Sequence, residues 1–253
     1  MTAIKKTMAI ALIALTLVGL LAGCAKKQTF VVGLDDEFPP MAFRDENNEI
    51  VGFDVDLAKE VGRRLGVEVT LQPIDWSTKE LELNSGRIDL IWNGLTITPQ
   101  RQEEMLVSRP YLANNQVLMV IAGSGFTAKS DLIGKNVGVQ TGSSAEIALA
   151  ADELGSKVKI TQFTNNVMAL QDLKIGRLDA VILDEVVARY YLTKEDAYMM
   201  LEDSLAAEEY GIAFKKGNTQ LHDKVMKAID EMLEDGTAAE ISSKWFGKDI
   251  ILR

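Results

Sequence analysis

Residues 81–93 read LELNSGRIDLIWN, and residues 170–183 read LQDLKIGRLDAVIL. Each segment has the pattern of a helix that ends at a glycine, Gly86 or Gly176, followed by arginine, an aliphatic residue, aspartate and a short apolar run. Glycine adopts the left-handed conformation that commonly ends a helix, and four or five successive apolar residues are typical of a strand buried on both faces. The repeat therefore predicts two similar α/β units in one chain.

A polar segment follows each apolar run. Residues 93–96 (Asn-Gly-Leu-Thr) follow the first run, and Asp184 and Glu185 follow the second. Ligands of open α/β sheets bind beyond the carboxyl ends of the strands. Both segments are thus predicted to form walls of a binding site, and a tandem duplication without a cleft is the alternative.

The rest of the chain completes the two units. Apolar periodicity and turn residues predict strands at 30–34, 67–71, 116–121 and 136–139, and helices at 54–65, 145–154, 221–233 and 238–245. The chain crosses between the units at 116–121 and returns at 209–214, and two crossings between two lobes form a hinge with a cleft beside it. We expect one lobe to contain residues 30–113 and 212–253, and the other to contain residues 114–211.

The N-terminus has the composition of an export signal. Lys5 and Lys6 precede an apolar run from residue 8 to residue 21, and a basic segment, a run of about 7–15 apolar residues and small residues before a cleavage site characterise secretory signals. Residues 21–24 (Leu-Ala-Gly-Cys) resemble the lipobox of bacterial lipoproteins. The resemblance implies a signal peptide at 1–23, acyl chains such as palmitate on Cys24, a polar tether over 24–29 and attachment to the cell membrane outside the cytoplasm. A plain signal peptide and a single membrane anchor are the alternatives, although a spanning helix needs ~20 apolar residues.

The composition excludes several classes of function. The 253-residue chain has a formal charge of −10. Removal of residues 1–23, whose only charged side chains are Lys5 and Lys6, leaves 230 residues with 25 basic and 37 acidic side chains, a charge of −12. This charge disfavours nucleic acid as a partner. His222 and Cys24 are the only histidine and cysteine, so the chain has little material for His/Cys metal sites or for Ser-His and Cys-His catalysis. No metal, cofactor or catalytic residue is predicted.

Residues 94–101 (Gly-Leu-Thr-Ile-Thr-Pro-Gln-Arg) are the most specific motif in the chain. They belong to a collinear series with VGFDVDL at 51–57, SRPY at 108–111, YGIAF at 210–214 and KWFG at 244–247. This series resembles the polar amino-acid solute-binding proteins of ATP-driven ABC importers over residues 30–247. The resemblance implies the periplasmic-binding-protein type II fold, in which two α/β lobes, each a sheet flanked by helices, are joined by a two-stranded hinge.

The resemblance assigns residues of the first lobe to the ligand's α-carboxylate. Arg101 matches the arginine that binds this group, and a planar guanidinium can donate two parallel hydrogen bonds to a carboxylate. Gly94 and Thr96 match positions that supply backbone and hydroxyl groups nearby, and glycine permits close approach of a ligand. Taken alone, the sequence around Arg101 favours a surface ion pair with Glu103 or Glu104.

The second lobe is expected to complete the amino-acid site. Residues 143–146 (Ser-Ser-Ala-Glu) have the spacing of a capping box, and the free N–H groups at a helix start attract anions. The resemblance implies that Ser144 contacts the ligand carboxylate, whereas Ser143 is expected to cap the helix. Asp184 matches the aspartate that binds the ligand α-ammonium, and Glu185 is expected to point away from the site.

Five further positions are expected to line the pocket. By resemblance, Asp35 is a first-lobe acid that meets the side chain, and Phe38 and Trp76 are aromatic residues that stack on it. Asn93 and Gln140 occupy flanking positions that vary within the family. Core packing is the alternative for the two aromatic residues.

The chain departs from the glutamine-binding members of the family at two positions. Gln140 and Leu183 stand where those members carry Lys and His, which removes two donors and disfavours glutamine or an acidic ligand. Residues 180–188 look more like the histidine and lysine/arginine/ornithine binders. Asp35 together with stacking aromatic residues suits a cationic side chain, so arginine, lysine or histidine is the favoured ligand.

The sequence thus predicts a monomeric, membrane-tethered binding protein and not an enzyme. It is expected to close on a polar L-amino acid and to deliver it to the permease and ATPase subunits of an ABC importer. Some relatives with this fold are extracytoplasmic dehydratases, and Asp35, Asp36, Asp75 and Glu185 could supply the general acid that such an enzyme needs. An amino-acid-sensing receptor domain and a surface adhesin also compete with the transport function.

Overall fold

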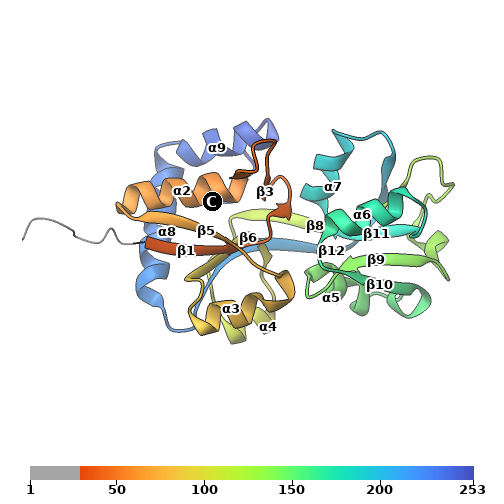
Figure 1. Ribbon diagram of the computed structural model, residues 1–253, viewed down its shortest axis with the longest axis horizontal. Coiled ribbons are helices and arrows are strands. Elements are labelled where there is room, and N and C mark those ends of the chain that lie inside the picture. Colours follow the sequence, from red (N-terminus) through yellow and green to blue (C-terminus); the bar gives the residue numbers. More distant parts are fainter. Residues whose placement is uncertain (1–28) are drawn as a thin grey trace, which may run out of the picture.

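The protein has two α/β lobes that share one mixed sheet, with the strand order β10-β9-β11-β8-β12-β6-β1-β5 (Figure 1). This computed structural model describes residues 29–253. The predicted signal peptide, the lipidation site Cys24 and the tether before Thr29 lie outside the described residues. The predicted two-lobed α/β fold is confirmed.

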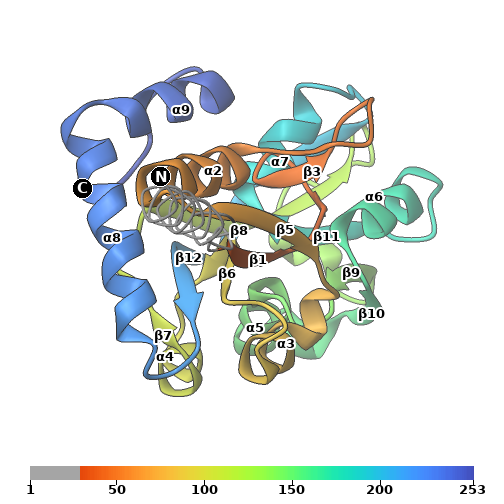
Figure 2. The same cartoon turned by 60° about the vertical axis from the view of Figure 1, so that its left-hand side comes forward.

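The first lobe is built on three parallel strands. β1 (Thr29–Leu34) lies between β5 (Glu68–Pro73) and β6 (Leu90–Thr96). On one face pack α2 (Phe53–Leu65), α8 (Thr219–Glu234) and α9 (Thr237–Phe246), and on the other α3 (Lys79–Ser85) and α4 (Pro99–Glu104). Figure 2 shows α8 and α9 beside α2. A separate small sheet contains β2 (Glu37–Phe38), β3 (Ala42–Arg44) and β4 (Ile50–Val51), and η1 (Trp76–Thr78) precedes α3.

The second lobe repeats this plan with three parallel strands and fewer helices. β9 (Asn136–Gln140) lies between β10 (Lys159–Phe163) and β11 (Ala180–Asp184). In Figure 1, α6 (Asn166–Lys174) and α7 (Glu185–Leu192) cover one face, and α5 (Ser144–Ala151) covers the other. The short helical turns η2 (Lys129–Leu132) and η3 (Gly155–Lys157) connect these elements.

Two long antiparallel strands at the centre of the sheet join the lobes. β8 (Leu112–Ile121) pairs with β11 of the second lobe, and β12 (Tyr198–Phe214) pairs with β6 of the first lobe and with the short β7 (Leu106–Val107). β8 and β12 also pair with each other. The sequence predicted only the end of β12, because the rest of this strand mixes apolar and acidic residues without a clear period and carries register shifts between Met200 and Ala206.

The repeated aspartates perform the same structural task in both lobes. Asp89 Oδ2 accepts a hydrogen bond from the backbone N–H of Val31 at 2.7 Å, and Asp179 Oδ2 accepts one from that of Asn136 at 2.8 Å. The backbone N–H of each aspartate donates to the carbonyl of the same partner, at 2.8 Å in both lobes. Each aspartate therefore ties the apolar strand that follows it to the first strand of its own lobe.

The repeated arginines are surface residues. Arg87 pairs with Glu82 at 2.8 Å, Arg177 pairs with Asp172 at 3.1 Å, and about 70% of each arginine side chain is exposed. The glycine before each arginine has a φ of +78° and ends the preceding helix, as the sequence predicts. The repeat is thus a structural unit of the scaffold.

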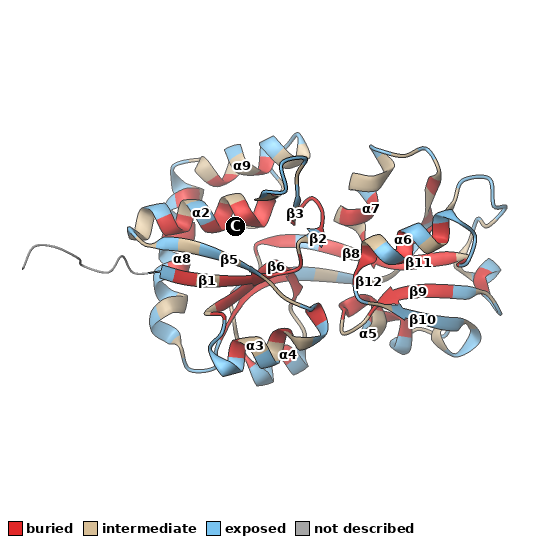
Figure 3. Cartoon of the chain, viewed as in Figure 1, coloured by how far each residue is buried: buried red, intermediate tan, exposed pale blue. Residues whose placement is uncertain are grey.

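Side chains of the central strands alternate between separate hydrophobic cores. In β6, Leu90 and Trp92 belong to a core cluster under α2, whereas Ile91 and Leu95 face α3 and α4. Figure 3 shows β6 as buried. Helix α5 ends earlier than predicted because the Asp152 carboxylate accepts the backbone N–H of Leu154 at 2.8 Å and stabilises a turn there.

Candidate functional site

The residues predicted to bind a ligand surround one small cavity between the lobes. The cavity is nearly closed: its volume is about 10 Å³, roughly the space that one water molecule needs. Its lining consists of Asp35, Phe38, Trp76, Asn93, Gly94, Arg101, Gln140, Ser143, Ser144 and Asp184. All of these except Ser143 were predicted as ligand residues. The remaining predicted residue, Thr96, lies beside the cavity with its Oγ1 2.9 Å from Ser144 Oγ.

The strand-end rule explains why these residues meet. Asp35 directly follows β1, Thr96 ends β6, Gln140 ends β9 and Asp184 ends β11. Carboxyl ends of parallel strands point to the same edge, and ligands bind beyond that edge. Both lobes therefore present strand ends to the space between them.

The two lobes touch each other around the cavity. Gln140 Nε2 of the second lobe donates to Asp35 Oδ2 of the first at 2.7 Å. Lys79 Nζ donates across the same boundary to the carbonyl of Gly142 at 3.0 Å. The structure therefore has a closed cleft, in which groups of both lobes are within reach of one small molecule.

Asp35 is a buried carboxylate, and among residues 29–253 its hydrogen-bond partners are all neutral groups. Its Oδ1 accepts the backbone N–H of Glu37 at 2.9 Å, and its own N–H donates to Asn93 Oδ1 at 2.9 Å. Burial raises the pKa of Asp35 to about 6, and the hydrogen bonds from Glu37 and Gln140 act against this shift. A cationic group in the cavity would stabilise the ionised form of this side chain.

Gly94 is needed for packing as well as for its backbone conformation. Its φ is +56°, and a Cβ atom at this position would lie 2.9 Å from Phe38 Cε1 and 3.1 Å from Tyr210 Cε2. The N–H of Gly94 donates to Asp54 Oδ2 at 2.7 Å. The glycine therefore lets two aromatic rings close around the strand, a reason that the sequence did not reveal.

Asp54 connects three of the sequence motifs. It is fully buried, and its carboxylate accepts hydrogen bonds from the N–H of Gly94 and from the hydroxyl of Tyr111 at 2.9 Å. Burial raises the pKa of Asp54 to about 7, against the effect of these hydrogen bonds. Asp54 thus holds the Gly94 segment in place from behind the cavity, a role that its place in a motif did not specify.

Arg101 is buried and is not part of a surface ion pair. It is only 4% exposed, and its Nη1 and Nη2 donate to the backbone carbonyls of Thr96 at 2.7 Å and Gly142 at 3.4 Å. Within residues 29–253 neither Glu103 nor Glu104 forms an ion pair with it, so the surface-pair interpretation is wrong. Burial lowers the pKa of the guanidinium, and nearby carboxylates oppose this effect.

Asp184 is the third buried charged residue that lines the cavity, after Asp35 and Arg101. Its Oδ1 accepts hydrogen bonds from Asn114 Nδ2 at 2.7 Å, Gln116 Nε2 at 2.9 Å and the hydroxyl of Tyr210 at 2.6 Å. Burial raises the pKa of Asp184 to about 7, and the neighbouring charge of Glu208 adds to this shift. All three direct partners are neutral, and a buried carboxylate without a cation is energetically costly.

Two polar side chains near Asp184 were not predicted from the sequence. Gln116, on β8, donates from Nε2 to Ser144 Oγ at 3.1 Å as well as to Asp184. Glu208, on β12, accepts hydrogen bonds from Thr96 and Gln116 at 2.9 Å. Side chains alternate along β12, so Glu208 lies on the same face as Tyr210. A predicted strand that began before residue 209 would have indicated this position.

The aromatic residues of the cavity belong to the hydrophobic cores as well. Phe38 is part of the large core cluster, and Trp76 is part of the cluster under α3. Lys79 Nζ lies 5.2 Å from the centre of the Trp76 ring and donates to the Trp76 carbonyl at 3.1 Å. The two roles considered for these residues, packing and lining of a site, are thus compatible. Lys79 is a buried cation at the site that the sequence did not identify.

The start of α5 is capped as predicted, with one difference. Ser143 Oγ accepts the N–H of Glu146 at 3.3 Å, but the Glu146 carboxylate reaches back to the N–H of Gly142 and not to that of Ser143. Ser143 also lines the cavity. Glu185 lies outside it, where its carboxylate binds Asn115 Nδ2 at 2.6 Å and Arg189, as expected for a structural residue.

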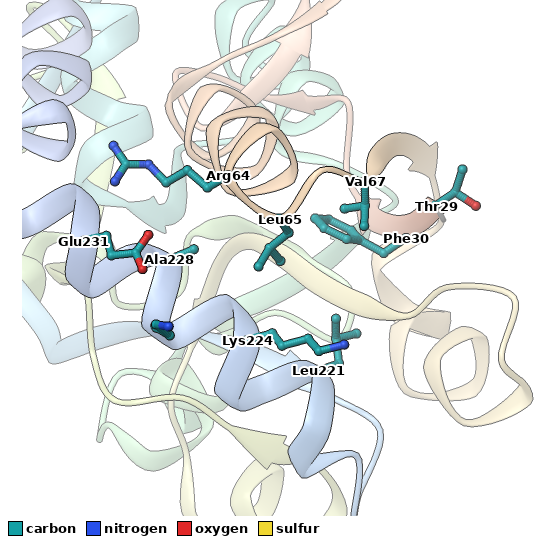
Figure 4. A pocket seen from close by; sticks show the side chains of 10 residues that line it. Thr29, Phe30, Arg64, Leu65, Val67, Leu221, Lys224, Ala228 and Glu231 are labelled. Carbon is teal, nitrogen blue, oxygen red and sulfur yellow. The ribbon is translucent and has the colours of Figure 1, made fainter. Parts of the chain in front are cut away.

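A wider surface hollow lies far from these residues. Figure 4 shows it between α2 and α8, beside the start of β1, with Arg64, Lys224 and Glu231 at its rim. It contains none of the predicted ligand residues. Among residues 29–253, no group of three or more His, Cys, Asp and Glu side chains is placed to hold a metal ion. Over the same range, no helix has the length and apolar character that crossing a membrane requires.

The sequence family of the chain agrees with the fold and with this site. The family described as bacterial extracellular solute-binding proteins, family 3, matches residues 30–248. The chain therefore belongs to this family, and the resemblance inferred from the motifs is confirmed.

Individual relatives match over nearly their whole length. The L-cystine-binding protein TcyJ of Escherichia coli K12 is 34% identical over 235 residues, which cover 92% of this chain and 88% of the relative. The arginine-binding extracellular protein ArtP of Bacillus subtilis 168 is 34% identical over 226 residues, 87% of either chain. A substrate-binding protein of an ABC uptake transporter from Streptococcus pneumoniae, solved with bound histidine, superposes with a TM-score of 0.86 at 38% identity and covers 89% of this chain and 95% of that chain.

Proposed function

We propose that the protein captures a polar L-amino acid between its two lobes, outside the cytoplasm, and delivers it to an ABC importer. The observation that carries this proposal is the pair Arg101 and Asp184. Both are buried at the same cavity, and the direct partners of each are neutral groups. A zwitterion brings a carboxylate for the first and an ammonium for the second, so it compensates both buried charges at once.

The ligand side chain is proposed to be cationic. Asp35 lies at the same cavity with a raised pKa and neutral partners, and a guanidinium, ammonium or imidazolium would supply its missing counter-charge. Phe38 and Trp76 offer aromatic surface to such a group. The relatives named for cystine, arginine and bound histidine support a polar amino acid, and we favour arginine, lysine or histidine among them.

The ligand is proposed to stabilise the closed form by touching both lobes. Asp35, Thr96 and Arg101 stand on one side of the cavity, and Ser144 and Asp184 on the other. A ligand shifts a conformational equilibrium only through its different affinities for the two states. Contacts that exist only when the lobes meet provide this difference. We place the moving parts at residues 30–113 with 212–253 and at residues 114–211.

The remaining parts of the proposal concern partners. The permease and ATPase subunits of an ABC importer would receive the ligand, as the transporter context of the relatives suggests. Lipidation of Cys24 would hold the protein at the membrane, and the protein would act as a monomer. We propose binding without chemical conversion of the ligand, so the amino acid should be recovered unchanged after incubation with the protein.

A calorimetric and thermal-shift screen tests the function. The full chain, purified in detergent, is titrated with the twenty amino acids, ornithine, citrulline and cystine. Because stabilisation follows RT ln(1 + [L]/Kd), a micromolar ligand at millimolar concentration adds about 4 kcal/mol to the free energy of unfolding. Arg109→Ala serves as a control, since this exposed arginine pairs with Asp230 away from the cavity. Binding of no amino acid would refute the proposal, and binding of only neutral ones would refute the cationic preference.

A further inference from the structure

Glu208 reaches side chains of both lobes from the hinge strand β12. Its Oε2 lies 2.9 Å from Thr96 Oγ1 in the first lobe and 3.2 Å from Ser144 Oγ in the second. The same oxygen accepts hydrogen bonds from Gln116 Nε2 at 2.9 Å and from Asn114 Nδ2 at 3.3 Å, both on β8. Glu208 therefore contacts the site residues without lining the cavity itself.

The available protons determine what this carboxylate does to its two hydroxyl partners. An ionised carboxylate only accepts hydrogen bonds, and each hydroxyl carries one proton. Thr96, Ser144 and Glu208 form a triangle of three contacts, because the two hydroxyl oxygens are also 2.9 Å apart. Both protons are used inside this triangle. The Thr96 hydroxyl therefore has no proton left for a ligand, and it keeps a lone pair that can accept a hydrogen bond.

Whether the Thr96 hydroxyl can donate or only accept a hydrogen bond determines which ligand group it can bind. An oxygen that can only accept suits an ammonium, which has donors and no acceptor. It cannot donate to the ligand carboxylate. That group would then depend on Arg101 and on the N–H groups at the start of α5, so the contact expected from Ser144 comes from its backbone.

We propose that Glu208 is a positioning residue that keeps Thr96 as a hydrogen-bond acceptor and thereby makes the site selective for an α-ammonium over an α-hydroxyl group. This inference rests on the proposed function, because it requires an amino acid in the cavity. Glu208 also lies beside Asp184 and shares the donors Asn114 and Gln116 with it. Two adjacent carboxylates favour a cation further, and an uncharged ligand group lacks this attraction.

The affinity ratio between an amino acid and its 2-hydroxy analogue tests the inference. The full chain in detergent is titrated with L-arginine and L-argininic acid, and with L-histidine and L-imidazolelactic acid. Glu208→Gln removes the negative charge that strengthens the hydrogen bond from Thr96 and the attraction for an ammonium, so the preference for the amino acid should fall ~10- to 100-fold. Glu209→Gln is the matched control, because Glu209 is exposed on the opposite face of β12, and its ratio should equal that of the unaltered protein.

A double-mutant cycle shows whether Glu208 acts through Thr96. Thr96→Val should lower the same ratio, and adding Glu208→Gln to it should lower the ratio little further. If Glu208→Gln does not fold, Thr96→Val and Glu208→Asp supply the test. Glu208→Asp keeps the charge and should retain more of the preference than Thr96→Val does.

The pH profile is a second readout that a purely structural role would not move. The charged and titratable groups around Asp184 are Arg101 on α4 and Glu208 and Tyr210 on β12. Removing the charge of Glu208 lowers the pKa of Asp184, so the loss of affinity on acidification should begin at a lower pH in Glu208→Gln. Asp35 is unchanged in this variant and provides an internal reference.

The outcomes separate the inference from the proposed function. Binding of an amino acid with an unchanged ratio in Glu208→Gln, or fully additive effects in the cycle, would overturn the role of Glu208 and leave the proposed function intact. If the unaltered protein binds neither amino acid, the proposed cationic ligand fails, and the inference fails with it.

Discussion

The two copies of the Gly-Arg-x-Asp repeat share a scaffold and differ in the segments that come after it. Residues 81–90 and residues 171–180 have the same burial class at every position. Asp89 and Asp179 bind the first strand of their lobes through the same pair of hydrogen bonds. Beyond the aspartates the copies diverge, because β6 has seven residues and β11 has five.

This divergence produces two different halves of a site. In the first copy, two further strand residues and a two-residue connection, residues 97–98, lead to α4, which carries Arg101 into the cavity. In the second copy, the strand passes directly into α7, and Asp184 stands at the junction. The first copy therefore leads to a cation at the cavity, and the second copy leads to an anion. The two copies share the residues that stabilise the fold, and the residues that line the cavity lie in the segments where the copies differ.

The largest effect should come from Arg101→Ala compared with Arg177→Ala. Loss of the buried guanidinium leaves a ligand carboxylate without its partner, and we expect a loss of ~2–5 kcal/mol in binding free energy. Arg177 is an exposed scaffold arginine, so its replacement should change affinity by less than about 0.5 kcal/mol. Isothermal titration calorimetry measures both. Equal effects of the two variants would break the distinction between scaffold and site.

Asp184→Asn should separate binding from stability. The pKa of Asp184 is raised to about 7 in the folded protein, from an ordinary value near 3.8, so ionisation opposes folding at pH 8 and this effect fades as the pH falls towards 4. Asparagine removes the buried charge, and the ligand-free variant should be more stable than the unaltered protein at pH 8, by about 1–3 kcal/mol. Ligand affinity should nevertheless fall at least tenfold.

Urea unfolding at pH 8 and pH 5, without ligand, checks this prediction. The stability difference between Asp184→Asn and the unaltered protein should be smaller at pH 5. A variant that is less stable at pH 8 would show that Asp184 holds the lobe together as Asp179 does.

The affinity for a cationic amino acid should fall on acidification. In the ligand-free protein the pKa is about 7 for Asp184 and about 6 for Asp35, and a bound cation lowers both values. Binding therefore releases protons below pH 7, and affinity should fall by up to about tenfold per pH unit for each group. Titrations at pH 8, 7, 6 and 5 measure this slope. Asp35→Asn should remove the lower step, and a flat profile would contradict the assignment of both groups.

The smallest effect should be the loss of the scaffold aspartates. Asp89→Ala and Asp179→Ala each remove a hydrogen bond that a backbone N–H donates to the carboxylate. We expect each to lower the free energy of unfolding by about 1–2 kcal/mol, and by similar amounts. Chemical denaturation measures the losses, and ligand affinity should stay unchanged. A large difference between the stability losses of the two variants would show that the two aspartates are not energetically equivalent, although their hydrogen bonds have the same geometry.

The sequence predicted the parts of the protein that depend on local patterns. Residue types at short spacing predict the helix ends at glycine, the buried strands and the polar residues at the strand ends. These predicted strand ends place Asp35, Asn93, Gln140 and Asp184 at one cavity. Arg101 needed more than local pattern. Its neighbours favour a surface ion pair, and only the series of motifs along the chain indicated a buried role.

Contacts between residues that are far apart in the sequence and meet only in the folded protein could not be predicted. Glu208 lies in a part of β12 where apolar and polar residues do not alternate regularly. Lys79 is the first residue of a short helix, where a lysine is usually exposed. Each is at the site because the lobes meet there. Asp54 was visible within a motif, but its partner Tyr111 is 57 residues away. Pairings over such distances depend on the whole fold.

The position of Trp76 gives the protein its own optical signal. Of the three tryptophans, Trp92 is buried in the core, and Trp245 on α9 donates a hydrogen bond to Asp56 of α2, so only Trp76 borders the cavity. A molecule that enters the cavity changes the surroundings of this indole and of the Lys79 ammonium above it. Replacing Trp92 and Trp245 by phenylalanine would leave one fluorophore at the site. Its emission would then follow filling and emptying in real time, without an added dye.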